Sequence, residues 1–199
     1  LCLFDVCDNA MLALQELQAQ KDAARETDPS ADEFQYDFFI STTPASNLDL
    51  MKETFGALSW PVEINFISDA GATFDDHFDD AFKQLFDMGY ESIVSVGGDI
   101  PTMPKSHVTQ AFQWLEYFQD NVRPGIVLAP CQECGTSLVG FSYNTPVNHQ
   151  GVYYNLDGTP ALDAYMAKIR EEDLPVAYFS PIADIDDKVD LAHAVSCMR

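Results

Sequence analysis

The sequence predicts an α/β domain with a largely parallel sheet covered by helices. Short β-rich apolar runs alternate with longer segments whose apolar residues recur every three or four positions. Strands separated by helices need crossover connections, which make neighbouring strands parallel. The 199 residues, 47% of them hydrophobic, suit one globular domain over residues 1–199 with a substantial core.

The first half of the chain alternates regularly. Residues 1–4 are expected to be a truncated first strand, and residues 9–25 a helix with Met11, Leu14 and Leu17 on one stripe. Pro44 ends the next expected strand, and Gly89 ends a helix that carries several phenylalanines. The other elements expected here are strands at 36–42 and 62–68 and helices at 47–58 and 73–88.

The second half continues the pattern. The strand expected at 92–96 runs into a Gly-Gly-Asp turn, and the helix expected at 104–118 has apolar residues at i, i+3 and i+4 spacing. The remaining expected strands are 125–129, 138–143 and 176–179, and the remaining helices are 157–170 and 188–195. An acidic Pro/Ser stretch at 26–33 is expected to be a disordered loop.

Charge and composition narrow the function classes. The net charge is −22, with 32 acidic and 10 scattered basic residues, which argues against a nucleic-acid partner. A phosphate ligand would therefore need a divalent cation. No apolar stretch reaches the roughly 18 residues of a membrane span, and no signal peptide is visible, so we expect no membrane partner. Five scattered cysteines argue against a disulfide framework and favour the cytoplasm.

Asp99 is the first candidate site residue. It follows the strand at 92–96 through Gly97 and Gly98, and glycines allow close approach of the backbone to a ligand. Ligands of such sheets gather at the carboxyl ends of strands, where a carboxylate suits Mg²⁺ or Mn²⁺. The alternative is that Asp99 only caps a turn or helix.

The acidic segment 184–190 is the second candidate. Alternation puts Asp184 and Asp186 on one side of an extended segment, so either could complete a cation site with Asp99. The alternative is that these carboxylates cap the helix expected at 188–195.

Cysteines and histidines give weaker signals. Cys131 and Cys134 have C-x-x-C spacing, but no second ligand pair accompanies them, so we interpret them as packing residues. The four histidines are dispersed, and His107 and His193 are expected on helix surfaces. Neither a P-loop nor the motifs G-x-G-x-x-G and G-x-S-x-G are present.

Several segments together resemble the motifs of one family. Residues 93–103 resemble a strand-G-S-D-C-P-x-L element, and residues 71–82 resemble a G-x-D-L-G-E-R-M-x-x-A-F helix start. Residues 127–140 are similar to G-P-x-x-D-G-G-Y-x-L-I-G, and residues 184–191 to D-I-D-T-P-E-D-L. With order and spacing in agreement from about residue 36 to the end, the chain resembles the bacterial nucleotide-diphospho-sugar transferase-like proteins of the GT-A fold.

The resemblance implies a three-layer, Rossmann-like GT-A fold with a mostly parallel mixed sheet. It implies a nucleotidyl- or glycosyltransferase that uses a nucleoside triphosphate or nucleotide-sugar, a small-molecule acceptor, and Mg²⁺ or Mn²⁺. Asp99 and Glu133 match catalytic positions. Metal ligands would be Asp99, Asp184 and Asp186, and the nucleotide would lie against Gly71, Gly97, Gly98 and Gly135. The oligomeric state stays open.

The sequence also departs from the family. A Gly-rich basic loop follows the first strand in the family, whereas Phe4 passes straight to Asp5 here. Either this protein has lost the loop or, as we expect, a segment is missing between the two residues. His77 and Thr136 replace the family's Arg and Tyr. A second hypothesis is therefore a degenerate GT-A module that binds a ligand or protein. A third is a flavodoxin-like or phosphatase-like domain, against which an antiparallel strand at 138–143 would argue.

Overall fold

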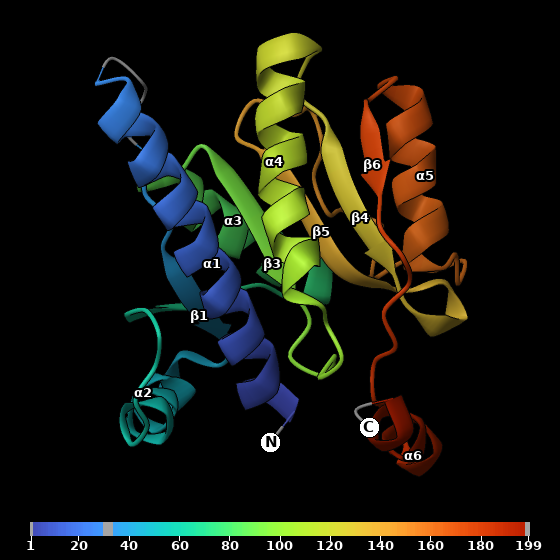
Figure 1. Cartoon of the computed structure of the whole chain (residues 1–199). Helices are drawn as coiled ribbons and strands as arrows, with labels where there is room; N and C mark the ends of the chain where they lie inside the picture. Colours follow the sequence, from blue (N-terminus) through green and yellow to red (C-terminus); the bar gives the residue numbers. More distant parts are fainter. Residues whose placement is uncertain (1, 30–33, 198–199) are drawn as a thin grey trace.

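The computed structural model describes residues 2–29 and 34–197, and six helices and six strands lie in this part of the chain (Figure 1). The strands are β1 (Phe38–Thr42), β2 (Ile64–Ser68), β3 (Ser92–Val96), β4 (Ile126–Pro130), β5 (Thr136–Ser142) and β6 (Val176–Tyr178). The helices are α1 (Cys2–Thr27), α2 (Leu48–Gly56), α3 (Phe74–Asp87), α4 (Lys105–Asn121), α5 (Ala161–Glu171) and α6 (Lys188–Cys197). Two short 3-10 helices are η1 (Ala45–Asn47) and η2 (Gln132–Cys134).

The strands form two sheets. β1 pairs with β2 in parallel, and the larger sheet has the order β3-β5-β4-β6. β5 is antiparallel to both of its neighbours, whereas β4 and β6 are parallel, so β3, β4 and β6 share one direction. The mixed sheet confirms the predicted architecture. The antiparallel β5 also argues against the flavodoxin-like alternative.

Three layers enclose the core because the sheet residues alternate between two faces. Val127 and Ala129 of β4 pack with apolar residues of α1 and α4, and Ile126 and Leu128 pack on the opposite face with α3 and α5. Figure 1 shows α1 and α4 side by side over one face of the sheets. A smaller cluster joins α1, β1 and α2 around Phe55.

Local sequence signals fix the ends of α3. The Thr73 hydroxyl accepts the Asp76 N–H at 3.2 Å, and the Asp76 carboxylate accepts the Thr73 N–H at 3.0 Å. This capping box satisfies donors that a helix start leaves free. Gly89 follows the helix with φ of 99°, a conformation that glycine adopts without strain.

The expected first strand at 1–4 is wrong. Residues from Cys2 onward belong to α1, whose buried face includes Val6, Ala10 and Leu14. Residues 2–4 form the first turn of this helix, and the apolar spacing continues from them at i, i+3 and i+4. α1 also runs unbroken across Phe4 and Asp5; the expected missing segment between these two residues stays a prediction.

Other expectations differ in detail. His107 was expected on the surface, but it is 9% exposed: its ring packs against Phe179, and its Nε2 lies 3.1 Å from the carbonyl oxygen of Ser180. The side chain of His193 and residues 30–33 of the expected acidic loop lie outside the described part. None of the described helices combines the length and apolar character needed to cross a membrane.

Candidate functional site

Three loops meet at the carboxyl ends of β3, β4 and β6. The Ile185 N–H donates to the Asp99 carbonyl oxygen at 3.0 Å, which joins the loop after β6 to the turn after β3. The Gln132 side chain donates to the Asp184 carbonyl oxygen at 2.8 Å and accepts the Asp184 N–H at 3.2 Å. These bonds hold residues 97–104, 131–135 and 182–186 as one assembly, so the structure brings Asp99 and Asp184 onto neighbouring loops.

The turn that carries Asp99 is fixed to the hydrophobic core by its apolar residues. Ile100 and Met103 are buried in the core under α1 and α4, whereas Asp99 itself is exposed. A Cβ on Gly97 would lie 2.8 Å from Asp99 Oδ1, so this glycine leaves room for the carboxylate. The Gly97 N–H donates to the Ser137 carbonyl oxygen at 3.0 Å. A fixed turn therefore presents a solvent-accessible carboxylate at the sheet edge.

Asp184 lies in a more enclosed place than Asp99. Its Oδ1 is buried without a hydrogen-bond partner among the described atoms. Asp184 and Asp186 both act on the pKa of the Cys131 thiol, and Asp184 has the larger effect of the two. Burial, followed by the contact with Asp184, raises the pKa of Cys131 to about 12. The thiol is thus protonated and uncharged at neutral pH.

The capping alternative applies to other carboxylates of the acidic segment. Asp187 Oδ1 accepts the N–H groups of Val189 and Asp190 at 2.6 and 3.1 Å. Asp190 Oδ2 accepts the N–H groups of Asp186 and Asp187, both at 3.2 Å. These two side chains cap α6, which leaves the carboxylate of Asp184 to face Cys131 and the loop after β4.

Asp99 and Asp184 supply carboxylate oxygens, the type of donor that hard cations such as Mg²⁺ prefer. In the described part of the chain, no group of three or more His, Cys, Asp or Glu side chains is placed to hold a metal ion by itself. Mg²⁺ usually takes one or two protein carboxylates and completes its shell with substrate phosphates and water. The unpartnered Asp184 oxygen and the exposed Asp99 carboxylate fit that mode of binding.

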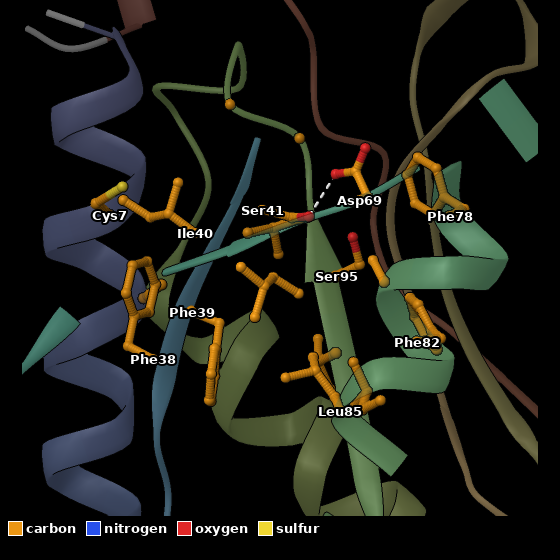
Figure 2. Close-up of a pocket in the computed structure, with 18 of the residues that line it drawn as sticks. Cys7, Phe38, Phe39, Ile40, Ser41, Asp69, Phe78, Phe82, Leu85 and Ser95 are labelled. Carbon is orange, nitrogen blue, oxygen red and sulfur yellow. Dashed lines mark hydrogen bonds between the residues drawn. The ribbon is translucent and has the colours of Figure 1, made fainter. Parts of the chain in front are cut away.

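A cavity of about 500 Å³ lies beside the Asp99 turn, between β1 and β3 (Figure 2). Gly97 and Gly98 line it, as do Ser41 and Asp69 at the carboxyl ends of β1 and β2 and His77 near the start of α3. The Ser41 hydroxyl bonds to Asp69, and His77 Nδ1 lies 2.7 Å from Asp69 Oδ1. No lysine or arginine is among the described residues that line the cavity.

Sequence reasoning missed Ser41 and Asp69. Both stand at the carboxyl ends of expected strands, which is the signal that selected Asp99. The signal was available, but neither residue belongs to a motif that would have drawn attention to it.

The predicted glycines have distinct local environments. A Cβ on Gly71 would lie 2.4 Å from Asp76 Cβ at the start of α3, and one on Gly135 would lie 2.5 Å from Cys131 Sγ. A Cβ on Gly98 would lie 2.9 Å from Leu3 Cδ1 of α1. Each position thus allows a close contact within the protein. Of these three glycines, Gly98 also lines the cavity.

Glu133, the second predicted catalytic residue, lies in η2 between Gln132 and Cys134. Its backbone is therefore part of the loop assembly that carries Asp184. Its side chain lies outside the part of the chain that the structure describes.

The buried carboxylate of Asp75, which the sequence analysis did not select, stabilises a loop next to the candidate site. Asp75 is 1% exposed and accepts the N–H groups of Gly151, Tyr153 and Tyr154 at 2.7, 2.7 and 3.2 Å. The Tyr153 hydroxyl lies 3.0 Å from Thr136 Oγ1, next to Gly135. Asp75 thereby fixes a loop whose tyrosine contacts the start of β5.

Comparison with known proteins adds a family and a fold. The family model described as "Uncharacterized protein conserved in bacteria (DUF2064)" matches residues 30–155. A search of the curated proteins finds no match to this chain.

Two solved structures are similar to this one. The first is a protein from Desulfovibrio desulfuricans G20 provisionally assigned as a nucleotide-diphospho-sugar transferase, with a TM-score of 0.62, 19% identity, and coverage of 94% of this chain and 71% of that chain. The second is 4-diphosphocytidyl-2C-methyl-D-erythritol synthase from Anaerococcus prevotii DSM 20548, with a TM-score of 0.51, 10% identity, and coverage of 94% and 89%. These likenesses confirm the GT-A-like fold.

Proposed function

Since this chain belongs to the bacterial DUF2064 family and has the fold of nucleotide-diphospho-sugar transferase-like proteins, we propose that it is a metal-dependent transferase. Its substrate class is a nucleoside triphosphate or nucleotide-diphospho-sugar, from which it transfers a nucleotidyl or glycosyl group to a small-molecule acceptor. The free described cysteines make the cytoplasm the expected compartment.

The observation that carries this proposal is the loop assembly at the carboxyl ends of β3, β4 and β6. Backbone bonds between Ile185 and Asp99 and the two bonds between Gln132 and Asp184 bring two carboxylates to one edge of the sheet. Ligands of open α/β sheets bind at this edge. The cavity beside Gly97 and Gly98 gives a nucleotide or acceptor direct access to the same turn.

The charge of the cavity lining determines how a bound diphosphate could be neutralised. The described lining of the cavity has no Lys or Arg, and the whole chain carries a charge of −22, so a diphosphate cannot be neutralised by the described lining residues. A bound Mg²⁺ or Mn²⁺ would supply this neutralisation and stabilise the leaving phosphate. Asp99 and Asp184 would hold it, with Asp186 as a further candidate ligand.

The protein's own residues mainly position the reactants in this proposal. In-line displacement needs alignment and charge stabilisation rather than a protein nucleophile. Gly97 and Gly98 allow the phosphates to approach the turn. The Gln132 side chain holds the loop of Asp184 against η2. Glu133 is the candidate for contacting the acceptor, since it matches the family's acidic residue in this loop.

The described lining of the cavity, without Lys or Arg, also favours a second candidate function. A GT-A module that has lost catalysis would keep the fold and the loop assembly, and it would bind a ligand or protein without turnover. Thr136, where the family has Tyr, fits this candidate because its hydroxyl pairs with Tyr153 rather than facing an acceptor. Turnover with any donor substrate would eliminate it.

The test is a thermal-shift panel of nucleoside triphosphates and nucleotide-sugars with and without Mn²⁺. The proposal is supported by a donor that raises Tm only when Mn²⁺ is present. This shift should occur in the wild type and in Asp120→Asn, and it should be absent in Asp99→Ala. Asp120 is the matched control because it is an exposed carboxylate near the far end of α4. No shift with any donor would contradict the proposal, whereas a shift without product formation would favour the binding module.

A further inference from the structure

The segment that leaves β6 continues to pair with β4, but its register shifts by one residue. Leu128 lies opposite Tyr178 in the parallel ladder, and the Phe179 N–H donates to the Leu128 carbonyl oxygen at 2.9 Å. The next bond to β4 comes from the Ile182 N–H, which donates to the Pro130 carbonyl oxygen at 2.9 Å. Three residues of the segment therefore span the same stretch as two residues of β4, which is the geometry of a β-bulge.

Proline explains where the register shifts. Donors of a parallel ladder come from every second residue, so the donor expected after Phe179 is residue 181. Pro181 has no N–H, and Ile182 donates in its place. Pro130 cannot donate either, and the pairing of β4 with β5 shifts at the same point, between Ala129 and Pro130. The bulge at residues 180 and 181 thus follows from the sequence.

The burial of the side chains agrees with the bulge. Side chains of a regular strand alternate between its two faces, and Ala177 and Phe179 pack in the core with α1 and α4. Regular alternation would put Ile182 on the opposite face, yet it is 4% exposed in the same cluster. A shift of one residue inverts the alternation of every residue that follows it. The bulge therefore determines on which side of the segment Asp184 emerges.

His107 holds the bulge from α4. Its Nε2 lies 3.1 Å from the carbonyl oxygen of Ser180, and its ring packs on Phe179 with the centroids 5.5 Å apart. A carbonyl oxygen only accepts, so Nε2 carries the hydrogen. The Nδ1 atom is buried without a partner among the described atoms, so the bond to Ser180 is the one polar contact that the structure gives this side chain.

The place of His107 in the fold joins it to the candidate site. It stands in the first turn of α4, directly after the turn 97–104, and its N–H donates to the Pro104 carbonyl oxygen at 2.9 Å. Its side chain thus connects the turn of Asp99 to the bulge that precedes Asp184. Bulges next to functional sites commonly redirect a side chain.

We propose that His107 is a positioning residue for the candidate cation site. Its Nε2–H stabilises the bulge at Ser180 and Pro181, and the bulge directs Asp184 toward the loop after β4. His107 acts only through the loop and contacts neither reactant nor cation. The effect on cation binding rests on the proposed function, whereas the bulge and its bond to His107 do not depend on it.

Two substitutions separate the hydrogen bond from the ring. His107→Phe keeps the ring contact and removes the donor, whereas His107→Gln supplies an amide N–H without the ring. Ser106→Ala is the matched control, since Ser106 is exposed in the same turn of α4. The measurement is the affinity for Mn²⁺ in the presence of ATP, GTP, CTP or UTP.

The donor, rather than the ring, should restore cation binding. We expect His107→Phe to bind Mn²⁺ about five- to tenfold more weakly, the effect of one lost hydrogen bond. His107→Gln and Ser106→Ala should remain close to the wild type. Equal binding by His107→Phe and the wild type, or equal losses in His107→Phe and His107→Gln, would overturn the proposal.

Amide hydrogen exchange without metal or nucleotide tests the bulge separately. The N–H groups of Ile182, Asp184 and Ile185 should exchange faster in His107→Phe than in His107→Gln, while the amides of β4 stay protected in both and show that the variants are folded. Equal exchange in the two variants would overturn the proposal. A wild type that binds no Mn²⁺ with any nucleotide would overturn the proposed function and the effect of His107 on cation binding, and the exchange rates would still decide whether His107 holds the bulge.

Pro181→Ala is a second variant, which decides if His107→Phe does not fold. Pro181 is exposed, so its replacement leaves the core intact. The new N–H of residue 181 can take the carbonyl oxygen of Pro130 and restore the regular ladder. We expect the Ile182 amide to lose its protection and Mn²⁺ binding to weaken. Full protection of the Ile182 amide together with wild-type Mn²⁺ affinity would contradict the proposal.

Discussion

The side-chain amide of Gln132 makes two hydrogen bonds with the backbone of Asp184, donating to its carbonyl oxygen at 2.8 Å and accepting its N–H at 3.2 Å. One side chain thereby ties the loop after β4 to the loop after β6. The two loops are 52 positions apart in the chain, so this contact is a property of the folded site rather than of a local motif.

Gln132→Ala should loosen this connection. Two hydrogen bonds of the usual net strength are worth about 1–3 kcal/mol together, so we expect a comparable fall in the free energy of unfolding. Urea denaturation followed by circular dichroism measures it. Gln110→Ala is the matched control, since Gln110 is exposed on α4. Equal stability of the two variants would show that the Gln132 bonds do not stabilise the loop.

Asp75→Ala should be among the most destabilising substitutions outside the apolar core. It would leave three backbone N–H groups of the 151–154 loop without their acceptor, and each buried unsatisfied donor costs about 1–3 kcal/mol. We expect a loss of about 3 kcal/mol or more in chemical denaturation and a smaller loss for Asp75→Asn, which keeps one acceptor oxygen. Asp120→Ala, with an exposed carboxylate replaced, should change little; a similar effect for all three would refute this role of Asp75.

Asp79 predicts how stability changes in acid. Burial acts to raise its pKa, but hydrogen bonds from His149 and Gln150 outweigh burial and lower the pKa to about 2. Because the pKa in the folded state is below that in the unfolded state, the stabilisation is present above about pH 4 and is lost as the pH falls toward 2. The stability difference between wild type and Asp79→Asn should therefore shrink over this range. A difference that stays constant from pH 5 to pH 2 would contradict the assignment.

Cys131 reports on its carboxylate neighbours. Its pKa of about 12 keeps the thiol protonated at pH 8, so iodoacetamide should modify Cys131 much more slowly than the exposed Cys134. Asp184→Asn removes a negative charge that raises this pKa, so alkylation of Cys131 should become faster. Mass spectrometry of timed digests measures both rates. Asp187→Asn is the matched control because Asp187 caps α6; equal rates in the two variants would show that Asp184 does not act on the thiol.

The strand at 92–96 and the helix that ends at Gly89 could be predicted from the sequence because their signals are local. The run 1–4 could not, since four apolar residues fit a strand or a helix turn equally well and only the burial of Val6 and Ala10 in α1 decides. The same limit applies to the site. The turn of Asp99 is visible as a strand followed by glycines, whereas the pairing of Ser41 with Asp69 and the role of Asp75 depend on contacts between distant segments.

The acidic segment at 184–190 contains both carboxylates whose role could be predicted from the sequence and one whose role could not. Capping was a sound expectation, and Asp187 and Asp190 fulfil it. Which carboxylate remains for the site could not be predicted, because it depends on where the β6 loop meets Gln132 and Cys131.

The most direct test of the proposed function is the binding of Mn²⁺ measured by electron paramagnetic resonance, with a nucleotide-sugar and a nucleoside triphosphate panel. We expect the wild type and Asp120→Asn each to bind one Mn²⁺ per protein molecule, seen as loss of the free Mn²⁺ signal, and only when a nucleotide is present. Asp99→Ala should bind Mn²⁺ at least about tenfold more weakly, which corresponds to the loss of one charged ligand contact of about 1.4 kcal/mol. Equal Mn²⁺ binding by wild type and Asp99→Ala, or none by either with any nucleotide, would contradict it.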